Sequence, residues 1–287
     1  LTQVAAIAHH TQTMRIGVAV TPVYTRTPAV LAATADVISQ VLPGRFVMGL
    51  GSSSQTIMGA WNGIPLDKPL TRVKETATMV RSMLKGEKSD FDLETLYSKG
   101  YRQAPCENPP PIYLAGLRAK MLEMAAEVGD GVIINLWPQG ALPKMLEHVK
   151  IGAQRAGKNW EDVEIVNRAM VLVTDDKDLG RNIFRASFGP YYATPVYNKY
   201  LAWAGYEDAA AAIREGWAAK DREKTAAAMS DEMIDEIAVI GTAQEVQERI
   251  RTDAHAGVHT QIIAPMAVTP EDAMRTFSAF TADKFSF

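Results

Sequence analysis

Five short segments combine small, hydroxylated or amide-bearing residues at the points where apolar runs end. They are "AVTPVYTRTP" (19–28), "GLGSSSQT" (49–56), "LAGLRAK" (114–120), "INLWPQG" (134–140) and "IIAPMA" (262–267). Each segment alone is typical of a turn, because Gly, Ser, Thr and Asn favour turns. Five in succession indicate a lined ligand pocket, since parallel strands that alternate with helices bring their carboxyl ends to one face.

The run Gly49-Leu50-Gly51 is followed by three serines. It is not a dinucleotide fingerprint, because the third glycine would fall at Ser54, no helix is expected to start there, and no acidic residue follows at the required distance. It also lacks the Gly-Lys-Ser/Thr of a P-loop. We interpret it as a pocket wall where the backbone approaches a large planar ligand and the hydroxyls meet its polar edges.

The segment "LAGLRAK" predicts a helix that begins near Arg118. A helix N-terminus attracts anions, so this is a candidate phosphate site, with an exposed helix-start arginine as the equally plain alternative. The histidines lack metal-ligand spacing and no Gly-x-Ser-x-Gly motif is present, so we predict neither a metal site nor a serine hydrolase. For a further group we predict helix packing rather than a pocket cover: Tyr191, Tyr192, Tyr197, Tyr200 and Trp203.

The elements that must position these segments alternate between short apolar runs and amphipathic stretches. Strands are predicted at 14–20, 45–51, 111–117, 131–137, 163–174 and 259–264. Helices are predicted at 28–42, 70–86, 118–129, 141–157, across most of 178–236, at 242–256 and from 270, with a polar hairpin at 90–103. Nearly continuous apolar strands between helices indicate a parallel sheet covered on both faces, either an open doubly wound sheet or a (β/α)8 barrel.

Composition excludes several classes of function. The net charge of −3 over 287 residues provides no bulk attraction for nucleic acid or anionic membranes, and no apolar run approaches the ~20 residues of a membrane span. Cys106 is the only cysteine, which excludes an intrachain disulfide and favours a reducing, cytoplasmic setting. We predict a structural role for Cys106 rather than a nucleophilic one.

Taken together, the motifs resemble the bacterial luciferase-like superfamily and, within it, the coenzyme F420-dependent oxidoreductases. The resemblance is carried by "TQTMRIGVAVTPVYTRTP", "LPGRFVMGLGSSS", "PLTRVKETATMVRSMLKGE", "PPIYLAGLRAKMLEMAAEVGDGVIINLWP" and "IAVIGTAQEVQERI". It implies a (β/α)8 TIM barrel with insertions, a single domain over 1–287 with a helical insert at about 178–236. It also implies that an N-terminal βαβ portion is missing, since the chain opens within a helical pattern and without Met.

The resemblance also implies a cofactor site. A cis peptide at Ala19–Val20 would lie behind a flavin or deazaflavin ring, with Thr21, Ser52 and Ser53 at the ring edge or ribityl chain. The track from ring to phosphate would follow Ala115, Gly116 and Leu117 to Arg118, with Asn135 nearby. Leu117-Arg118-Ala119 departs from the Gly-Gly or Gly-Pro of many members, and Ser54 stands where a sugar-phosphate dehydrogenase of the family has a Glu proton donor. The catalytic residues stay unassigned, because the missing N-terminal portion would carry the acidic or His residue near the ring.

The function implied is hydride transfer between coenzyme F420 and an unidentified small organic substrate. Two alternatives stay open: an FMN-dependent monooxygenase of the same architecture, and a barrel that binds a ligand without catalysis. The resemblance also implies a homodimer, and the composition predicts no nucleic-acid or membrane partner.

Overall fold

The computed structural model describes all 287 residues, which divide into two compact units. The first unit comprises residues 1–133 and 147–164, and the second comprises 134–146 and 165–287. None of the helices is long and apolar enough to span a bilayer. The single domain expected from the sequence stays a prediction, and each unit is described by itself.

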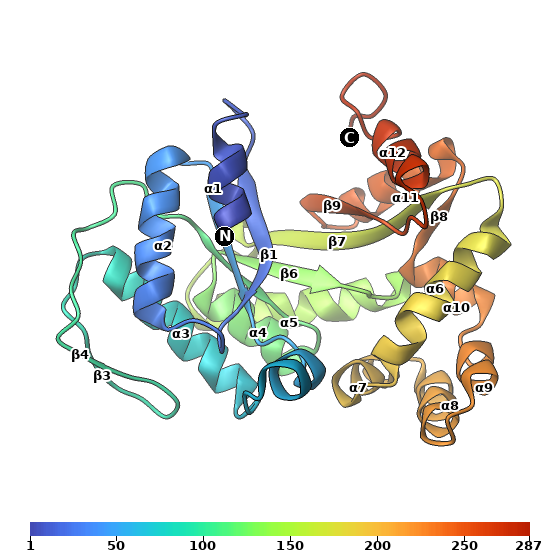
Figure 1. Cartoon of the computed structure of the whole chain (residues 1–287), viewed down its shortest axis with the longest axis horizontal. Helices are drawn as coiled ribbons and strands as arrows, with labels where there is room; N and C mark the ends of the chain where they lie inside the picture. The colour runs from blue at the N-terminus through green and yellow to red at the C-terminus, as the bar shows by residue number, and fades with distance from the viewer. The chain divides into compact units, whose positions relative to one another are not determined.

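The first unit is built on four parallel strands. They are paired in the order β1 (Ile16–Pro22), β2 (Phe46–Gly51), β5 (Ile112–Ala115) and β6 (Gly131–Asn135), and the last two residues of β6 belong to the second unit. The helices of this unit are α1 (Thr2–Ala8), α2 (Pro28–Val41), α3 (Pro69–Leu84), α4 (Ala119–Val128) and the π-helical turn η1 (Thr56–Ala60) (Figure 1). Helix α5 (Leu142–Arg155) runs through both units and is followed by the short turn η3 (Trp160–Asp162).

Local sequence explains these elements. Thr27 accepts a hydrogen bond from the Val30 amide and Pro28 occupies the first turn of α2, the expected start of a helix. The polar hairpin β3 (Asp90–Asp92) and β4 (Tyr97–Lys99) forms as predicted, and Glu75 of α3 accepts hydrogen bonds from the amides of its turn. Cys106 is buried, and burial raises the pKa of its thiol, which disfavours the reactive thiolate.

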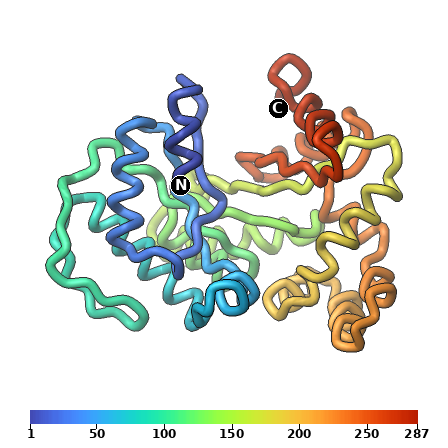
Figure 2. Tube along the Cα trace, viewed as in Figure 1, coloured from blue at the N-terminus to red at the C-terminus, as the bar shows by residue number.

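The second unit is built on three parallel strands. The long strand β7 (Glu164–Val173, its first residue in the first unit) pairs with β8 (Val239–Gly241) and with β9 (Thr260–Pro265). Between β7 and β8 the chain forms the helical insert, yellow to orange in Figure 2. The remaining bounds are α6 (Lys177–Tyr192), α7 (Pro195–Trp203), α8 (Glu207–Ala218), α9 (Arg222–Ala227), α10 (Asp231–Ile237), α11 (Ala243–His255), α12 (Pro270–Ser278) and η2 (Gln139–Ala141).

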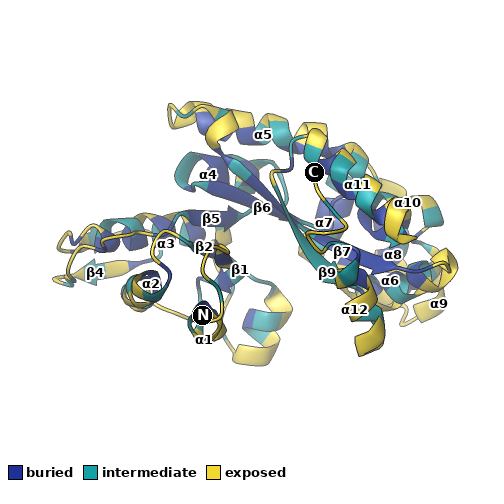
Figure 3. Ribbon diagram, turned by 90° about the horizontal axis from the view of Figure 1, so that it is seen from above, coloured by how far each residue is buried: buried dark blue, intermediate teal, exposed yellow.

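Buried residues follow the strands and the covering faces of the helices in each unit (Figure 3). In the second unit one face of β7, with Met170 and Leu172, packs against the insert, while Ala169, Val171 and Val173 pack with residues of α11. This alternation follows from the two-residue period of a strand. Tyr192 and Tyr200 are fully buried in the insert, so helix packing is confirmed for these two of the five aromatic residues, whereas Tyr191 is 37% exposed.

The structure corrects three details of the sequence prediction. The segment Val239–Gly241 is a strand, too short to be predicted from its composition. A helical turn does begin after Ser54, whose hydroxyl accepts a hydrogen bond from the Ile57 amide. Strand β1 extends two residues beyond the predicted end, because Thr21 and Pro22 still pair with β2.

Candidate functional site

Nine of the ten predicted cofactor residues lie in the first unit, at or near the carboxyl ends of three neighbouring strands. Ala19, Val20 and Thr21 belong to the end of β1, Ser52 and Ser53 follow β2 directly, and residues 115–118 connect β5 to α4. Pairing places Thr21 beside Leu50 and Leu50 beside Leu114, so the three strand ends are adjacent. Asn135 belongs to the second unit.

The end of β1 is irregular. Its register with β2 shifts between Val18 and Thr21, and the Ala19–Val20 peptide is cis, as the family resemblance implied. Ala19 is exposed and Val20 is half-buried, whereas Thr21 is 5% exposed. The only exposed side chain among these three residues is therefore the small methyl group of Ala19.

The two glycines of β2 have a different role from the one expected. A Cβ at Gly49 would lie 1.8 Å from the carbonyl oxygen of Val18, and a Cβ at Gly51 would lie 2.7 Å from Cγ2 of Val20 and 3.2 Å from Cβ of Ala115. Close approach at this motif is thus made by strand β1 and not by a ligand. Sequence reasoning identified the motif, but only the neighbouring strand explains why it requires glycine.

The serine loop after β2 presents hydroxyl groups. Ser52 Oγ donates a hydrogen bond to the Ser53 carbonyl at 3.3 Å, and Ser53 has a positive φ of 65°. Both serines are half-buried. Ser54 Oγ accepts a hydrogen bond from the Ile57 amide and so caps the following turn.

The connection from β5 to α4 leaves one arginine without a partner. Gly116 is buried and donates its amide to the Ile133 carbonyl at 3.0 Å, and a Cβ there would make a tight contact of 3.1 Å with Leu122 of α4. Arg118 is the N-cap residue of α4, and its guanidinium forms no ion pair or hydrogen bond within the first unit. Free amides of the first helical turn and a positive side chain together favour an anion.

Asn135 ends β6 in the second unit. Its side chain interacts with Tyr197 of α7, while its Oδ1 atom is buried without a hydrogen-bond partner. Burial raises the pKa of the Tyr197 hydroxyl to about 12, so this phenol is protonated at neutral pH. Asn135 was predicted as a site residue but Tyr197 was not, because helix packing was preferred to a pocket cover for the group of aromatic residues that includes it.

The chain matches a known family over most of its length. Residues 1–260 match the profile described as luciferase-like monooxygenase. The chain is 31% identical to a 5,10-methylenetetrahydromethanopterin reductase of Archaeoglobus fulgidus over 269 residues, which cover 92% of this chain and 80% of that protein.

Two solved structures show the same fold. The coenzyme F420-dependent tetrahydromethanopterin reductase of Methanopyrus kandleri has a TM-score of 0.79 and 19% identity, covering 99% of this chain and 86% of that one. An F420-dependent secondary alcohol dehydrogenase in complex with an F420–acetone adduct has a TM-score of 0.74 and 18% identity, covering 98% and 82%. The α/β fold class expected from the sequence is thereby confirmed.

Proposed function

Because this chain belongs to the luciferase-like monooxygenase family, we propose that it is an oxidoreductase that transfers hydride between coenzyme F420 and a small organic substrate. The support from comparison is the 31% identity with a reductase and the shared fold with two enzymes named for their dependence on F420. The observation that carries the proposal is the assembly of the predicted residues at three adjacent strand ends.

The residues of this site fit such a cofactor. The exposed Ala19 and the half-buried Ala115 would adjoin the planar ring, and the hydroxyls of Ser52 and Ser53 would meet its polar edge or the ribityl chain. Arg118, with the first-turn amides of α4, would hold the phosphate, since it has no competing carboxylate. Thr21 and Val20 would support the ring from the strand, with Gly116 and Leu117 along the track to the phosphate.

When bound, a 5-deazaflavin supplies two-electron chemistry, because it has carbon at the reactive ring position and so moves hydride. The protein's part is to bind and orient the ring. Gly51 leaves room for Val20 beside β2, because a Cβ at Gly51 would lie 2.7 Å from Cγ2 of Val20.

Cofactor binding tests the proposal directly. Purified protein is titrated with F420 and, separately, with FMN, and the dissociation constants are measured by fluorescence. We expect F420 to bind more tightly than FMN. Tight FMN binding without F420 binding, together with oxygen consumption when a flavin reductase is supplied, would instead establish an FMN-dependent monooxygenase.

A variant tests the assigned phosphate site. Arg118→Met removes the charge at the start of α4, and we expect F420 binding to weaken about tenfold, the usual effect of losing one charge-assisted hydrogen bond. The matched control is Arg45→Met at the opposite end of β2, where the guanidinium bonds to Thr11 and to the Met14 carbonyl. Equal affinity in the Arg118 variant and the wild type would refute the assignment.

We also propose that the protein forms a homodimer and works in the cytoplasm. The dimer is supported by two exposed apolar side chains on α2, since Val30 and Val37 are 51% and 59% exposed and lie two helical turns apart. The lone buried thiol of Cys106 suits a reducing compartment. Sedimentation equilibrium measures the oligomeric state, and a monomer at micromolar concentration would contradict the dimer.

A further inference from the structure

Arg168 of β7 is a half-buried arginine that no carboxylate neutralises. It lies two residues before Met170 and so on the strand face that packs against the helical insert. Its Nη1 donates only to the Sδ of Met170, at 3.2 Å, a weak acceptor. A partly buried charge is normally paired, because its removal from water is costly.

The other partly buried arginines of the second unit follow that rule. Arg181 and Arg185 pair with aspartates on α10, and Arg249 pairs with Asp253 at 3.1 Å. Their side chains are 18%, 20% and 18% exposed. Arg168 differs from them in lacking a carboxylate, which indicates that its partner is a molecule outside the chain.

Two further polar groups gather near Arg168. Tyr197 packs against the buried cluster that contains Met170 and Leu136, and Asn135 directly precedes Leu136 in the chain. Arg168 and Asn135 both lower the pKa of the Tyr197 hydroxyl, against the larger effect of burial. The ring of Tyr191 lies edge-on to that of Tyr197, with centroids 4.6 Å apart. Asn135 Oδ1 is buried and has no hydrogen-bond partner, so a ligand that carries a donor group could bind to it.

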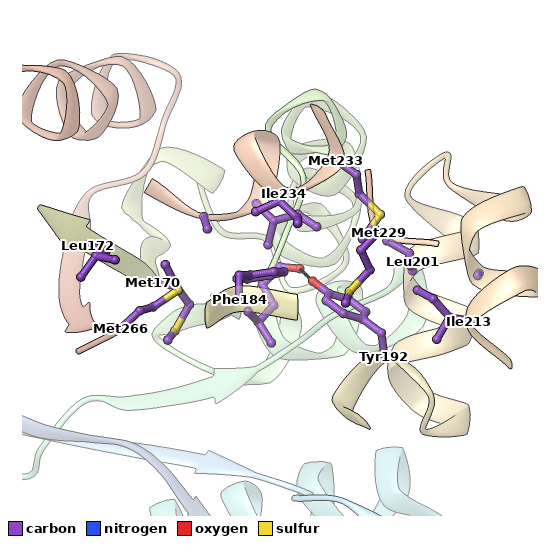
Figure 4. Close-up of a cluster of buried hydrophobic side chains, with 14 residues drawn as sticks. Met170, Leu172, Phe184, Tyr192, Leu201, Ile213, Met229, Met233, Ile234 and Met266 are labelled. Atoms are coloured by element: carbon purple, nitrogen blue, oxygen red, sulfur yellow. Dashed lines mark hydrogen bonds between the residues drawn. The ribbon is translucent and has the colours of Figure 1, made fainter. Parts of the chain in front are cut away.

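The surroundings of this polar group are apolar. Met170, Met266, Leu136 and Tyr192 belong to one buried cluster against which Tyr197 packs, and the Tyr192 hydroxyl donates to the Leu136 carbonyl at 3.1 Å (Figure 4). A few convergent polar groups in apolar surroundings are typical of a small-molecule site, and the low local dielectric strengthens attraction for an anion.

We infer that Arg168, Asn135 and Tyr197 bind the acidic group of the substrate, a carboxylate or phosphate with a hydrogen-bond donor beside it. The guanidinium donates to the acid oxygens, as it does in most arginine–carboxylate pairs. Asn135 Oδ1 accepts from the neighbouring hydroxyl or N–H, which fills its missing bond. This inference rests on the proposed function, because it names the chemical class of the molecule that exchanges hydride.

Small acids serve as probes. Glycolate has a hydroxyl next to its carboxylate and acetate lacks it, and ligand-observed NMR titrations measure the dissociation constants of both without cofactor. We expect the wild type to bind glycolate more tightly than acetate, and Arg168→Met to weaken glycolate binding at least tenfold. Arg168→Lys keeps the charge but loses the planar guanidinium, so its affinity for glycolate should lie between those of the wild type and Arg168→Met.

The control is Arg251→Met, on α11, whose guanidinium contacts Glu248 and the Ser286 carbonyl. It should bind glycolate like the wild type, and thermal unfolding shows whether each variant is folded. The inference would be overturned if the wild type bound neither acid. It would also be overturned if folded Arg168→Met or Arg168→Lys bound glycolate as tightly as the wild type does.

A separate F420 titration of the same variants distinguishes the two proposals. Unchanged F420 affinity in Arg168→Met assigns the group to the substrate. A tenfold loss of F420 affinity in that variant would show that Arg168 serves the cofactor, and the substrate assignment would fail. Glycolate binding by a protein that does not bind F420 would refute the proposed function while the acid site stands.

Discussion

Replacing Gly49 by alanine should be far more damaging than the size of one methyl group suggests. The added Cβ would lie 1.8 Å from the carbonyl oxygen of Val18, whereas ordinary contact begins at 3.4 Å. Strand β1 would have to move by about 1.6 Å, the difference between those two distances. The alanine Cβ has a fixed position on the backbone and its partner is a backbone oxygen, so no side-chain rotation relieves the clash.

The expected loss of stability follows from what that movement breaks. Overpacking of a tightly packed site costs about 1–3 kcal/mol. Displacing β1 also weakens the backbone hydrogen bonds of a strand pair that runs from Ile16↔Phe46 to Pro22↔Gly51, each worth about 1 kcal/mol. We therefore expect a loss of about 3–5 kcal/mol, a large part of the total stability of a typical domain.

Gly63→Ala is the matched control for this variant. Gly63 has a φ of +66° and nothing within 4 Å of its Cβ position, so alanine there meets backbone strain but no clash. That change should cost about 1 kcal/mol. Urea unfolding followed by circular dichroism measures the free energy of unfolding of both variants.

Gly49→Ala should be the less stable of the two variants by at least about 1 kcal/mol. If Gly49→Ala unfolds within 1 kcal/mol of Gly63→Ala, strand β1 does not lie against Gly49 as described. The account of why this motif needs glycine would then be wrong, and with it the positions of Ala19 and Val20.

Two further predictions concern the first unit. Burial, with help from Glu164, raises the pKa of Tyr113 to about 12, above the usual value of 10, so its contribution to stability is complete below pH 10 and is lost as pH rises through 12. Tyr113→Phe should therefore lose less stability than the wild type between pH 8 and pH 11 in urea unfolding, and parallel pH profiles would contradict this. Lys158 donates to the carbonyls of Ala126, Glu127 and Gly129 at 3.1, 3.0 and 2.7 Å, so Lys158→Met should cost about 2 kcal/mol in the same assay, whereas the exposed Lys199→Met should cost little. Equal stability of the two lysine variants would show that the Lys158 contacts are not maintained.

Much of the fold could be predicted because its signals are local. The continuous apolar runs of β2, β5 and β6 indicate buried parallel strands, and the Thr27-Pro28 start of α2 marks a helix. The site residues at the ends of strands could be predicted from the sequence. Parallel strands bring their carboxyl ends together even when the strands are far apart in the sequence. The short strand β8 was missed because three residues have too little period to detect.

What the sequence determined by itself is the order of strands and helices, and therefore which segments meet at the carboxyl ends. Only the tertiary structure decided what each residue meets there. Gly49 is glycine because the Val18 carbonyl oxygen lies where a Cβ would be, and the hydrogen-bond acceptor beside Arg168 is the sulfur of Met170 rather than a carboxylate. The physical reason is that these contacts depend on distances between segments far apart in the chain, which no local pattern of residues encodes.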